Sequence, residues 1–517
     1  MESIQLNLAK KTLYFLTFIS LFFQIYFLES NSDYLCLFLI FVSNIFTIFY
    51  CFNSKYFFDY PLSLMTIFIS HFINLGGVLF LKSVEFSLLT SNLYLPLSTI
   101  NNLFLFNITI ILGHLIYMKL GVSGIIKEKL INLFLKFKFF EIKNINFLYF
   151  LSCLAIISKF LFYDLNTAYY LQNTTDPSIF RDFLNGLNYF IFVPIIIFVI
   201  NYIQDEKKYK INKFFIFFYF LSLLFIALSR NNRSMMFDII LLLSIVFILL
   251  FFLSKIKFYK KDLIKLILLA FLIFPLSTIV EKLSNNFLLE RQNYFSKSPI
   301  ENVYSFIKNF SFSNKNQTFT DNQEFKKYDL FSEINYSTNY LNRFNIIKIH
   351  DNFNYINQSI TDFQLEALKD IQINKIISIF PKPVIKIFDK NFDKNKYVSF
   401  TTASFLYGNY SDQSSKLNIG SALMTLHIIF GNWSYLIVLL CFLPFFILLD
   451  SFYISKNNIL SPYVLVFLYS TSIGIFNYFS ASEIYLWINF VIRTIPQTLI
   501  ILIFLRFIFN IFFKKFS

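Results

Sequence analysis

The first residues that could do chemistry are two arginines in the segment ALSRNNRSMM. Arg230 and Arg233 lie three residues apart, inside an otherwise apolar stretch that runs from 214 to 253. A guanidinium group offers paired N–H donors to phosphate oxygens, and a charge among apolar residues is unfavourable unless it has a partner. Two roles are open. The pair could bind an anionic headgroup, or it could cap the preceding helix and reach phosphates of the outer leaflet.

A second group of candidates lies in a polar part of the chain. Two short segments, RFNIIKIHDNF and PKPVIK, contribute cations and possible proton acceptors, which are Arg343, Lys348, His350, Asp351, Lys382 and Lys386. Arg343 and Lys382 could bind phosphate, and His350 or Asp351 could act as a general base by residue type. A run of charges is more often a solvated face, so this alternative stays open.

A third group precedes an apolar run, in the segment LHIIFGNWSYL. His427 is a further candidate base, and Asn432, Trp433 and Tyr435 combine amide and aromatic side chains. Such side chains at the mouth of a membrane protein suit sugars. The alternative is an aromatic belt at the membrane interface with a Gly-Asn turn.

Several kinds of site lack support in the sequence. We find no His/Asp/Glu cluster at metal-ligand spacing, no glycine-rich phosphate loop and no nucleophile elbow, and the four cysteines form no Cys-x-x-Cys motif. The sequence therefore predicts no metal and no cofactor. The net charge of +15 is better explained by membrane topology than by nucleic-acid binding.

Hydrophobic residues make up 56% of the 517, with 75 phenylalanines, which predicts an all-α polytopic integral membrane protein. A span needs roughly 20 mostly apolar residues. By that rule about twelve transmembrane helices are expected, near 12–29, 33–52, 62–81, 99–118, 146–163, 183–203, 212–229, 235–253, 263–280, 423–449, 461–480 and 484–511.

Lysines alternate between the loops in a way that predicts orientation. With the N-terminus in the cytoplasm, the cytoplasmic loops hold runs of lysine, for example Lys127 to Lys143 and Lys255 to Lys261, whereas the outer loops hold few cations. Both termini are therefore expected in the cytoplasm. The first apolar run lacks a cleavage site for a signal peptidase and is interpreted as a span.

Three regions follow from this topology. Residues 1–280 form an N-terminal transmembrane bundle of about nine spans, and residues 421–517 form a C-terminal transmembrane segment of about three. Between them, 281–420 is polar and rich in Asn, Ser, Lys and Tyr, which predicts a large, mostly helical extracytoplasmic loop domain.

The layout and several motifs together resemble a known family, the O-antigen and capsule polymerases of the Wzy type. LSRNNRS resembles the family's turn in which an arginine follows a small residue and opens an apolar helix. RFNIIKIH resembles an arginine-bearing part of the large loop, IFPKPV a proline-lysine segment there, and LHIIFGNWSYL the Phe-Gly segment that enters the next span.

The resemblance implies a metal-independent glycosyltransferase at the periplasmic face of the bacterial inner membrane. Its substrates would be undecaprenyl-pyrophosphate-linked oligosaccharides, with a flippase and a chain-length regulator as further partners and no nucleic acid. Cations would hold the pyrophosphate as the anomeric bond breaks. The candidates are Arg230, Arg233, Arg343 and Lys382 for pyrophosphate, Asn432, Trp433 and Tyr435 for glycan, and His427, His350 or Asp351 as base.

Two alternatives share parts of this pattern. An O-antigen ligase has the same layout and lipid donor but transfers the glycan to lipid A-core. A lipid-linked oligosaccharide flippase also has about twelve spans, but transporters usually place charges at the bilayer midplane and show repeated halves. The predicted spans contain few acidic residues, Asp238 being one, and no internal repeat is evident.

Overall fold

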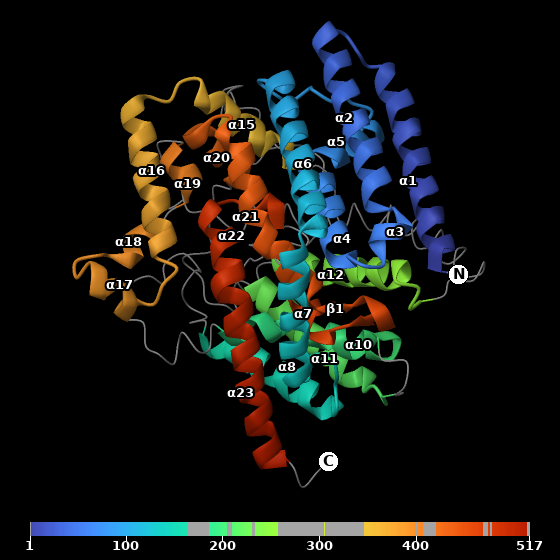
Figure 1. Cartoon of the computed structure of the whole chain (residues 1–517), viewed down its shortest axis with the longest axis vertical. Coiled ribbons are helices and arrows are strands. Elements are labelled where there is room, and N and C mark those ends of the chain that lie inside the picture. The colour runs from blue at the N-terminus through green and yellow to red at the C-terminus, as the bar shows by residue number, and fades with distance from the viewer. Residues whose placement is uncertain are drawn as a thin grey trace.

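The computed structural model of the chain is built almost wholly of helices (Figure 1). It describes residues 2–162, 186–203, 209–229, 233–256, 304, 346–398, 401–406, 420–468, 474–475 and 478–513. The span predicted at 263–280 lies outside these ranges. Within them, the strands are β1 (Tyr453–Ile454) and β2 (Ile459–Leu460), which pair antiparallel.

The described helices occur along the chain in the following order. In the first half they are α1 (Glu2–Ile25), α2 (Asn31–Cys51), α3 (Ser54–Phe57), α4 (Pro61–His71), the π turn η1 (Phe72–Gly76), α5 (Gly77–Val84), α6 (Pro96–Lys119), α7 (Gly121–Lys136), α8 (Ile145–Phe162), the 3-10 helix η3 (Asn188–Phe192), α10 (Val193–Ile203), α11 (Lys213–Ser229) and α12 (Arg233–Phe252).

The second half has a polar part followed by apolar helices. Its elements are α15 (Ile347–Asn357), α16 (Asp362–Ile377), α17 (Lys382–Phe388), α18 (Lys394–Val398), α19 (Thr402–Leu406), α20 (Ala422–Phe430), α21 (Trp433–Asp450), the 3-10 helices η8 (Ser455–Asn457), η9 (Pro462–Phe467) and η10 (Tyr478–Ser480), α22 (Ile484–Asn489), the π turn η11 (Phe490–Thr494) and α23 (Ile495–Phe513).

Six helical runs in the described part are long and apolar enough to cross a membrane. They are Ile4–Ile25, Asn31–Cys51, Pro61–Val84, Pro96–Lys119, Trp433–Asp450 and Ile484–Phe512. This confirms the prediction of an all-α membrane protein. Four other predicted spans coincide with shorter apolar helices, and the described part of 461–480 contains the 3-10 helices η9 and η10 in place of a long helix. The number of twelve spans stays a prediction.

The starts of the long helices follow from local sequence. Ser30 caps α2, accepting from the N–H of Asp33, whose carboxylate in turn accepts from the N–H of Ser30. Both α4 and α6 begin with a proline, Pro61 and Pro96, at the first position, where the missing N–H is not needed.

Helix α6 lies at the centre of the bundle, packed against α2 on one side and α21 on the other (Figure 1). We call the end where α6 begins the upper end, as Figure 1 shows it, and the end where α21 finishes the lower end. Helix α12 runs crosswise below α1 and α3, where the Phe252 ring contacts those of Phe52 and Phe57. The sequence predicted a span in this region.

A buried polar cluster joins four helices at the lower end. Asp450 of α21 accepts from the N–H and the hydroxyl of Ser63 in α4, at 3.2 and 2.7 Å. His114 of α6 lies 2.7 Å from both the Ser63 Oγ and the Tyr50 hydroxyl of α2. Hydrogen bonds between helices stabilise apolar bundles in this way. His114 is thus a packed, hydrogen-bonded residue.

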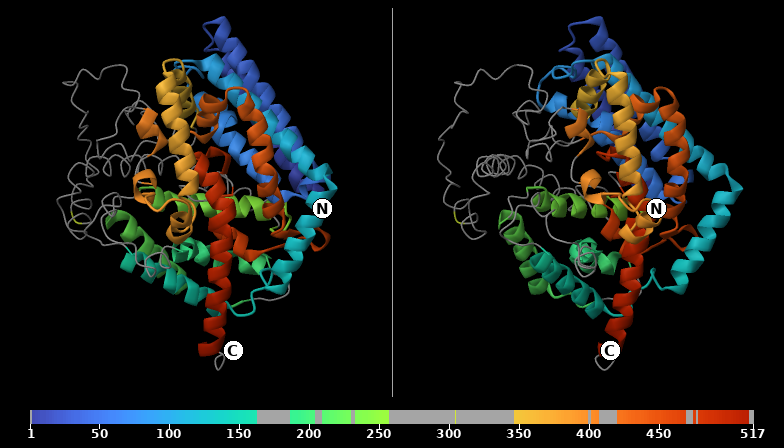
Figure 2. Two further views of the ribbon diagram at one scale, coloured as in Figure 1. Left: turned by 60° about the vertical axis from the view of Figure 1, so that its left-hand side comes forward. Right: turned by 90° about the vertical axis from the view of Figure 1, so that its left-hand side faces the viewer.

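Within the polar segment 346–398, α15 and the start of α16 lie at the upper end, and α17 and α18 lie lower (Figure 1). Helix α15 packs against α6 and α20, and in both views of Figure 2 α16 stands beside the upper part of the bundle. The capping box of Thr361 and Gln364 fixes the start of α16. Residues predicted to form an outer domain therefore contact the helices directly.

Candidate functional site

The π turn η1 interrupts the apolar run Pro61–Val84 and contacts the start of the polar segment. In η1 the N–H of Gly77 bonds to the carbonyl of Phe72, five residues back, so the ordinary helical ladder is interrupted. The Ile73 carbonyl instead accepts from the N–H of Ile346, at 3.1 Å, and the Gly76 carbonyl from the Asn44 amide, at 3.4 Å. The widened turn thus leaves the Ile73 carbonyl free to accept the N–H of Ile346, the residue that precedes α15.

His350 is held at the junction of three elements. Its Nε2 lies 2.9 Å from the Asn74 Oδ1 of η1, and its Nδ1 lies 2.7 Å from the Ser421 Oγ beside α20. Because an amide oxygen only accepts, Nε2 carries the proton and Nδ1 accepts from the hydroxyl. Burial lowers the pKa of His350 to about 3, so the ring is neutral at physiological pH.

Asp351 anchors the start of α6. Its Oδ2 accepts from the N–H of Tyr94 at 2.7 Å and from Lys348 at 3.1 Å. Its Oδ1 accepts from the N–H of Leu95 at 2.9 Å and from the Thr99 hydroxyl at 3.1 Å. A carboxylate has about four lone-pair positions, and all four have donors here. This geometry suits an anchor between α15 and α6, whereas a general base needs a free oxygen.

A small cavity lies beneath this junction, between η1, α6 and α20. It has a volume of about 20 Å³, room for a single water molecule, and His71, Asn74, Phe106 and Asn107 are among its lining residues. The Nε2 of His71 lies 2.9 Å from the Asn44 Oδ1. His71 is therefore a packed, hydrogen-bonded residue.

Gly76 is required by the close approach of α2 to the π turn. A Cβ at this position would lie 2.2 Å from the Asn44 Oδ1 and 2.6 Å from the His71 Nε2. We expect Gly76→Ala to destabilise the purified protein by about 1–3 kcal/mol, because the added methyl group has no space. Thermal unfolding in detergent would measure this. Gly124→Ala is the matched control, since nothing lies within 4 Å of its added Cβ, and equal melting temperatures for the two variants would contradict the expectation.

The turn between α20 and α21 gathers the third group of predicted residues. Gly431 adopts φ +53°, which a glycine reaches without strain, and the chain reverses there. The rings of His427 and Tyr435 lie 5.8 Å apart, and Tyr435 packs on Phe106 of α6 at 4.7 Å. The Tyr435 hydroxyl donates to the Asn102 Oδ1 at 3.2 Å. The aromatic cluster thus packs on α6.

His427 and its neighbours are open to ligands to different degrees. The His427 Nδ1 lies 3.4 Å from the Ser434 hydroxyl, and the ring also contacts the Gly431 backbone, whereas none of the side-chain hydrogen bonds of the described residues involves Nε2. Trp433 is 71% exposed, and Asn432 beside it is also exposed. Of the three predicted bases, His427 is thus the one that keeps a ring nitrogen available, and it does so next to two of the predicted glycan-binding residues.

The predicted pyrophosphate-binding residues cannot be placed in this arrangement. Arg230 and Arg343 lie outside the described residues. Arg233 is the first residue of α12 and Lys382 the first of α17, and their side chains are also outside the description. Within the described part, no three His, Cys, Asp or Glu side chains lie close enough together to hold a metal ion.

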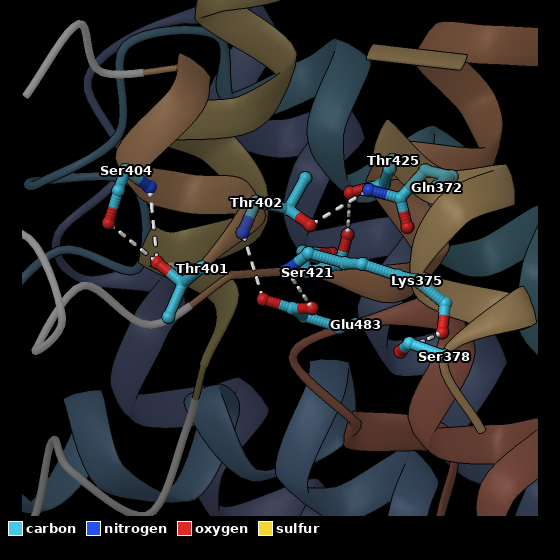
Figure 3. Close-up of polar contacts among 9 residues, drawn as sticks. All are labelled: Gln372, Lys375, Ser378, Thr401, Thr402, Ser404, Ser421, Thr425 and Glu483. Carbon is cyan, nitrogen blue, oxygen red and sulfur yellow. Dashed lines mark hydrogen bonds and ion pairs between the residues drawn. The ribbon is translucent and has the colours of Figure 1, made fainter. Parts of the chain in front are cut away.

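Sequence reasoning missed a buried ion pair between the last turn of α16 and the residue before α22. Lys375 of α16 lies 2.6 Å from Glu483, which immediately precedes α22 (Figure 3). The other carboxylate oxygen of Glu483 accepts from the N–H of Thr402, and Thr402 accepts from Gln372, both at 2.8 Å. Glu483 is the single acid between 451 and 513, and that isolation was the signal that could have pointed to it.

The chain was also compared with known proteins. No family model matches the sequence, and no curated protein or solved structure is similar to it.

Proposed function

We propose that the chain is a polysaccharide polymerase of the Wzy type. The reaction would transfer a growing glycan from undecaprenyl pyrophosphate to a hydroxyl of the next lipid-linked repeat unit. The bond between the anomeric carbon and the pyrophosphate oxygen breaks, a bond to the acceptor oxygen forms, and the pyrophosphate leaves with the electron pair. The proposal includes twelve spans, cytoplasmic termini and a reaction at the periplasmic face of the inner membrane.

The observation that carries the proposal is the turn between α20 and α21. It presents a half-buried imidazole, an exposed indole and an exposed amide at the start of a helix long enough to span a membrane. In this proposal the His427 Nε2 takes the proton of the acceptor hydroxyl. Trp433 and Asn432 contact the sugar rings, because an aromatic face and an amide together suit a glycan.

The resemblance supplies the other half of the site. Arg230, Arg233, Arg343 and Lys382 would bind the pyrophosphate, whose negative charge increases as the anomeric bond breaks. This part of the proposal rests on residue type and position in the sequence.

Expression in a strain that lacks its own polymerase, together with the matching glycan pathway, tests the proposal. A restored ladder of long chains supports a polymerase. Lipid A-core that carries single units points to a ligase instead, and unpolymerised lipid-linked units that merely change sides of the membrane point to a flippase. Either of these two outcomes, without long chains, would overturn the proposal.

If the wild-type protein restores the ladder, the two arginines of SRNNRS should be essential for chain extension. We expect Arg230→Ala and Arg233→Ala each to reduce chain extension by about 10²–10³-fold, because each removes a cation from the developing charge. Lys369→Ala is the control, since Lys369 is an exposed cation of α16. Immunoblots of membranes must show equal insertion, and full-length ladders from both arginine variants would exclude the pyrophosphate role.

A further inference from the structure

The last candidate span contains two arginines with different surroundings. In Ile484–Phe512 they are Arg493, inside the π turn η11, and Arg506, in α23. Arg506 is well satisfied, since it donates to the Phe137 carbonyl at 2.7 Å and to the Tyr463 hydroxyl at 2.9 Å. Its guanidinium also lies within 6 Å of three aromatic ring centres.

Arg493 has fewer partners. Its Nε donates to the Gln497 Oε1 at 3.4 Å and its Nη1 to the Ile379 carbonyl at 3.0 Å. Within the described part of the chain no carboxylate pairs with it, and Nη2 has no acceptor. Two contacts therefore fix the orientation of a half-buried guanidinium while three of its five N–H groups are left for a ligand. π turns occur frequently at functional sites.

In the topology predicted from the sequence, the two arginines point toward opposite sides of the membrane. Thirteen residues of helix separate them, about 20 Å along the axis. Arg506 contacts the connection after α7, and Arg493 contacts the polar segment just before α17. Long cationic side chains extend toward the headgroups at both ends of a span, so this separation is compatible with a hydrocarbon core of about 30 Å. With this predicted topology, the side chain of Arg493 extends toward the phosphates of the outer headgroups.

We propose that Arg493 binds the phosphate group of a lipid headgroup. The remaining N–H groups of Nη1 and Nη2 form a fork that matches two phosphate oxygens, and an anion supplies the charge partner that the described residues lack. The proposal does not depend on the polymerase reaction. The same phosphate chemistry occurs in glycerophospholipids and in polyprenyl phosphates, and the experiment separates these sources.

The test uses the purified full-length protein in a neutral detergent, titrated with phosphatidylglycerol or with undecaprenyl phosphate and followed by native mass spectrometry. We expect Arg493→Gln to weaken binding of at least one lipid about tenfold or more, because a charge-assisted hydrogen bond is lost. Arg506→Gln removes a charge from the same helix and should leave lipid binding unchanged. Loss with only one lipid identifies the source, and loss with both indicates recognition of phosphate alone.

A second variant guards against misfolding. Arg493→Lys keeps the charge but loses the fork of paired N–H donors. Its lipid affinity should lie between those of wild type and Arg493→Gln, and its melting temperature should be near that of wild type. If the Arg493→Gln protein binds both lipids as tightly as wild type, or if Arg506→Gln weakens binding equally, the proposed site is wrong.

Discussion

Replacing Glu483 by glutamine is expected to lower the stability of the protein by about 3–5 kcal/mol, because it removes the carboxylate that pairs with the buried ammonium of Lys375. The two groups lie 2.6 Å apart, with side-chain exposures of 2% for Lys375 and 5% for Glu483. Glutamine keeps an oxygen for the N–H of Thr402, so the lost charge dominates the effect. The midpoint of unfolding in a detergent series would measure it.

A double variant distinguishes the ion pair from simple packing. Burial lowers the pKa of Lys375 even though Glu483 raises it, so desolvation outweighs the attraction. The combination Lys375→Met with Glu483→Gln removes both charges, and it should recover most of the stability lost in the single variant. Glu366→Gln, at an exposed position of α16, should change stability by less than about 0.5 kcal/mol. A double variant less stable than Glu483→Gln would contradict this account.

Much of the bundle could be predicted from apolar length alone. The expected spans 33–52 and 484–511 correspond to the helical runs Asn31–Cys51 and Ile484–Phe512. This success has a simple cause, since a backbone surrounded by lipid must satisfy its hydrogen bonds within one helix. Proline and serine signals then place the starts of α2, α4 and α6 within a few residues.

Local irregularities could not be predicted in the same way. The π turns η1 and η11 lie in apolar sequence that looks continuous, and they depend on partners far away, such as Ile346 for the Ile73 carbonyl. The run 461–480 has the composition of a span, but Pro462 begins a 3-10 helix there. Composition measures whether a segment prefers lipid, and it does not determine which neighbours interrupt its helix.

The candidate bases show the limit of reasoning from residue type. His350 and Asp351 looked like catalytic residues because imidazole and carboxylate accept protons. Some of their partners, such as Asn74 and Tyr94, lie more than 250 residues away in the sequence, and these contacts give both side chains an anchoring role. His427 keeps a free nitrogen because α20 ends within one turn of it, at a glycine with positive φ.

The contrast between two histidines gives the strongest test of the proposed mechanism. In the strain that lacks its own polymerase, we expect His427→Gln to reduce chain extension on the order of 10²–10⁴-fold, because a positioned base is lost. Its melting temperature should stay close to that of wild type, since His427 is only half buried and its hydrogen bond to the Ser434 side chain is long, at 3.4 Å. The readouts are ladder length per amount of inserted protein and thermal unfolding of the same variant.

His350→Gln is the matched comparison, because it removes the same group at a buried position. It should lower the melting temperature clearly, since both ring nitrogens of His350 have partners within 2.9 Å and glutamine cannot reproduce both bonds. Any loss of product should then follow the amount of folded protein, with activity per folded molecule preserved. A base at His427 predicts opposite patterns for the two variants. If His427→Gln extends chains normally while His350→Gln loses activity without losing stability, the proton acceptor is His350 and the proposed role of the α20–α21 turn is wrong.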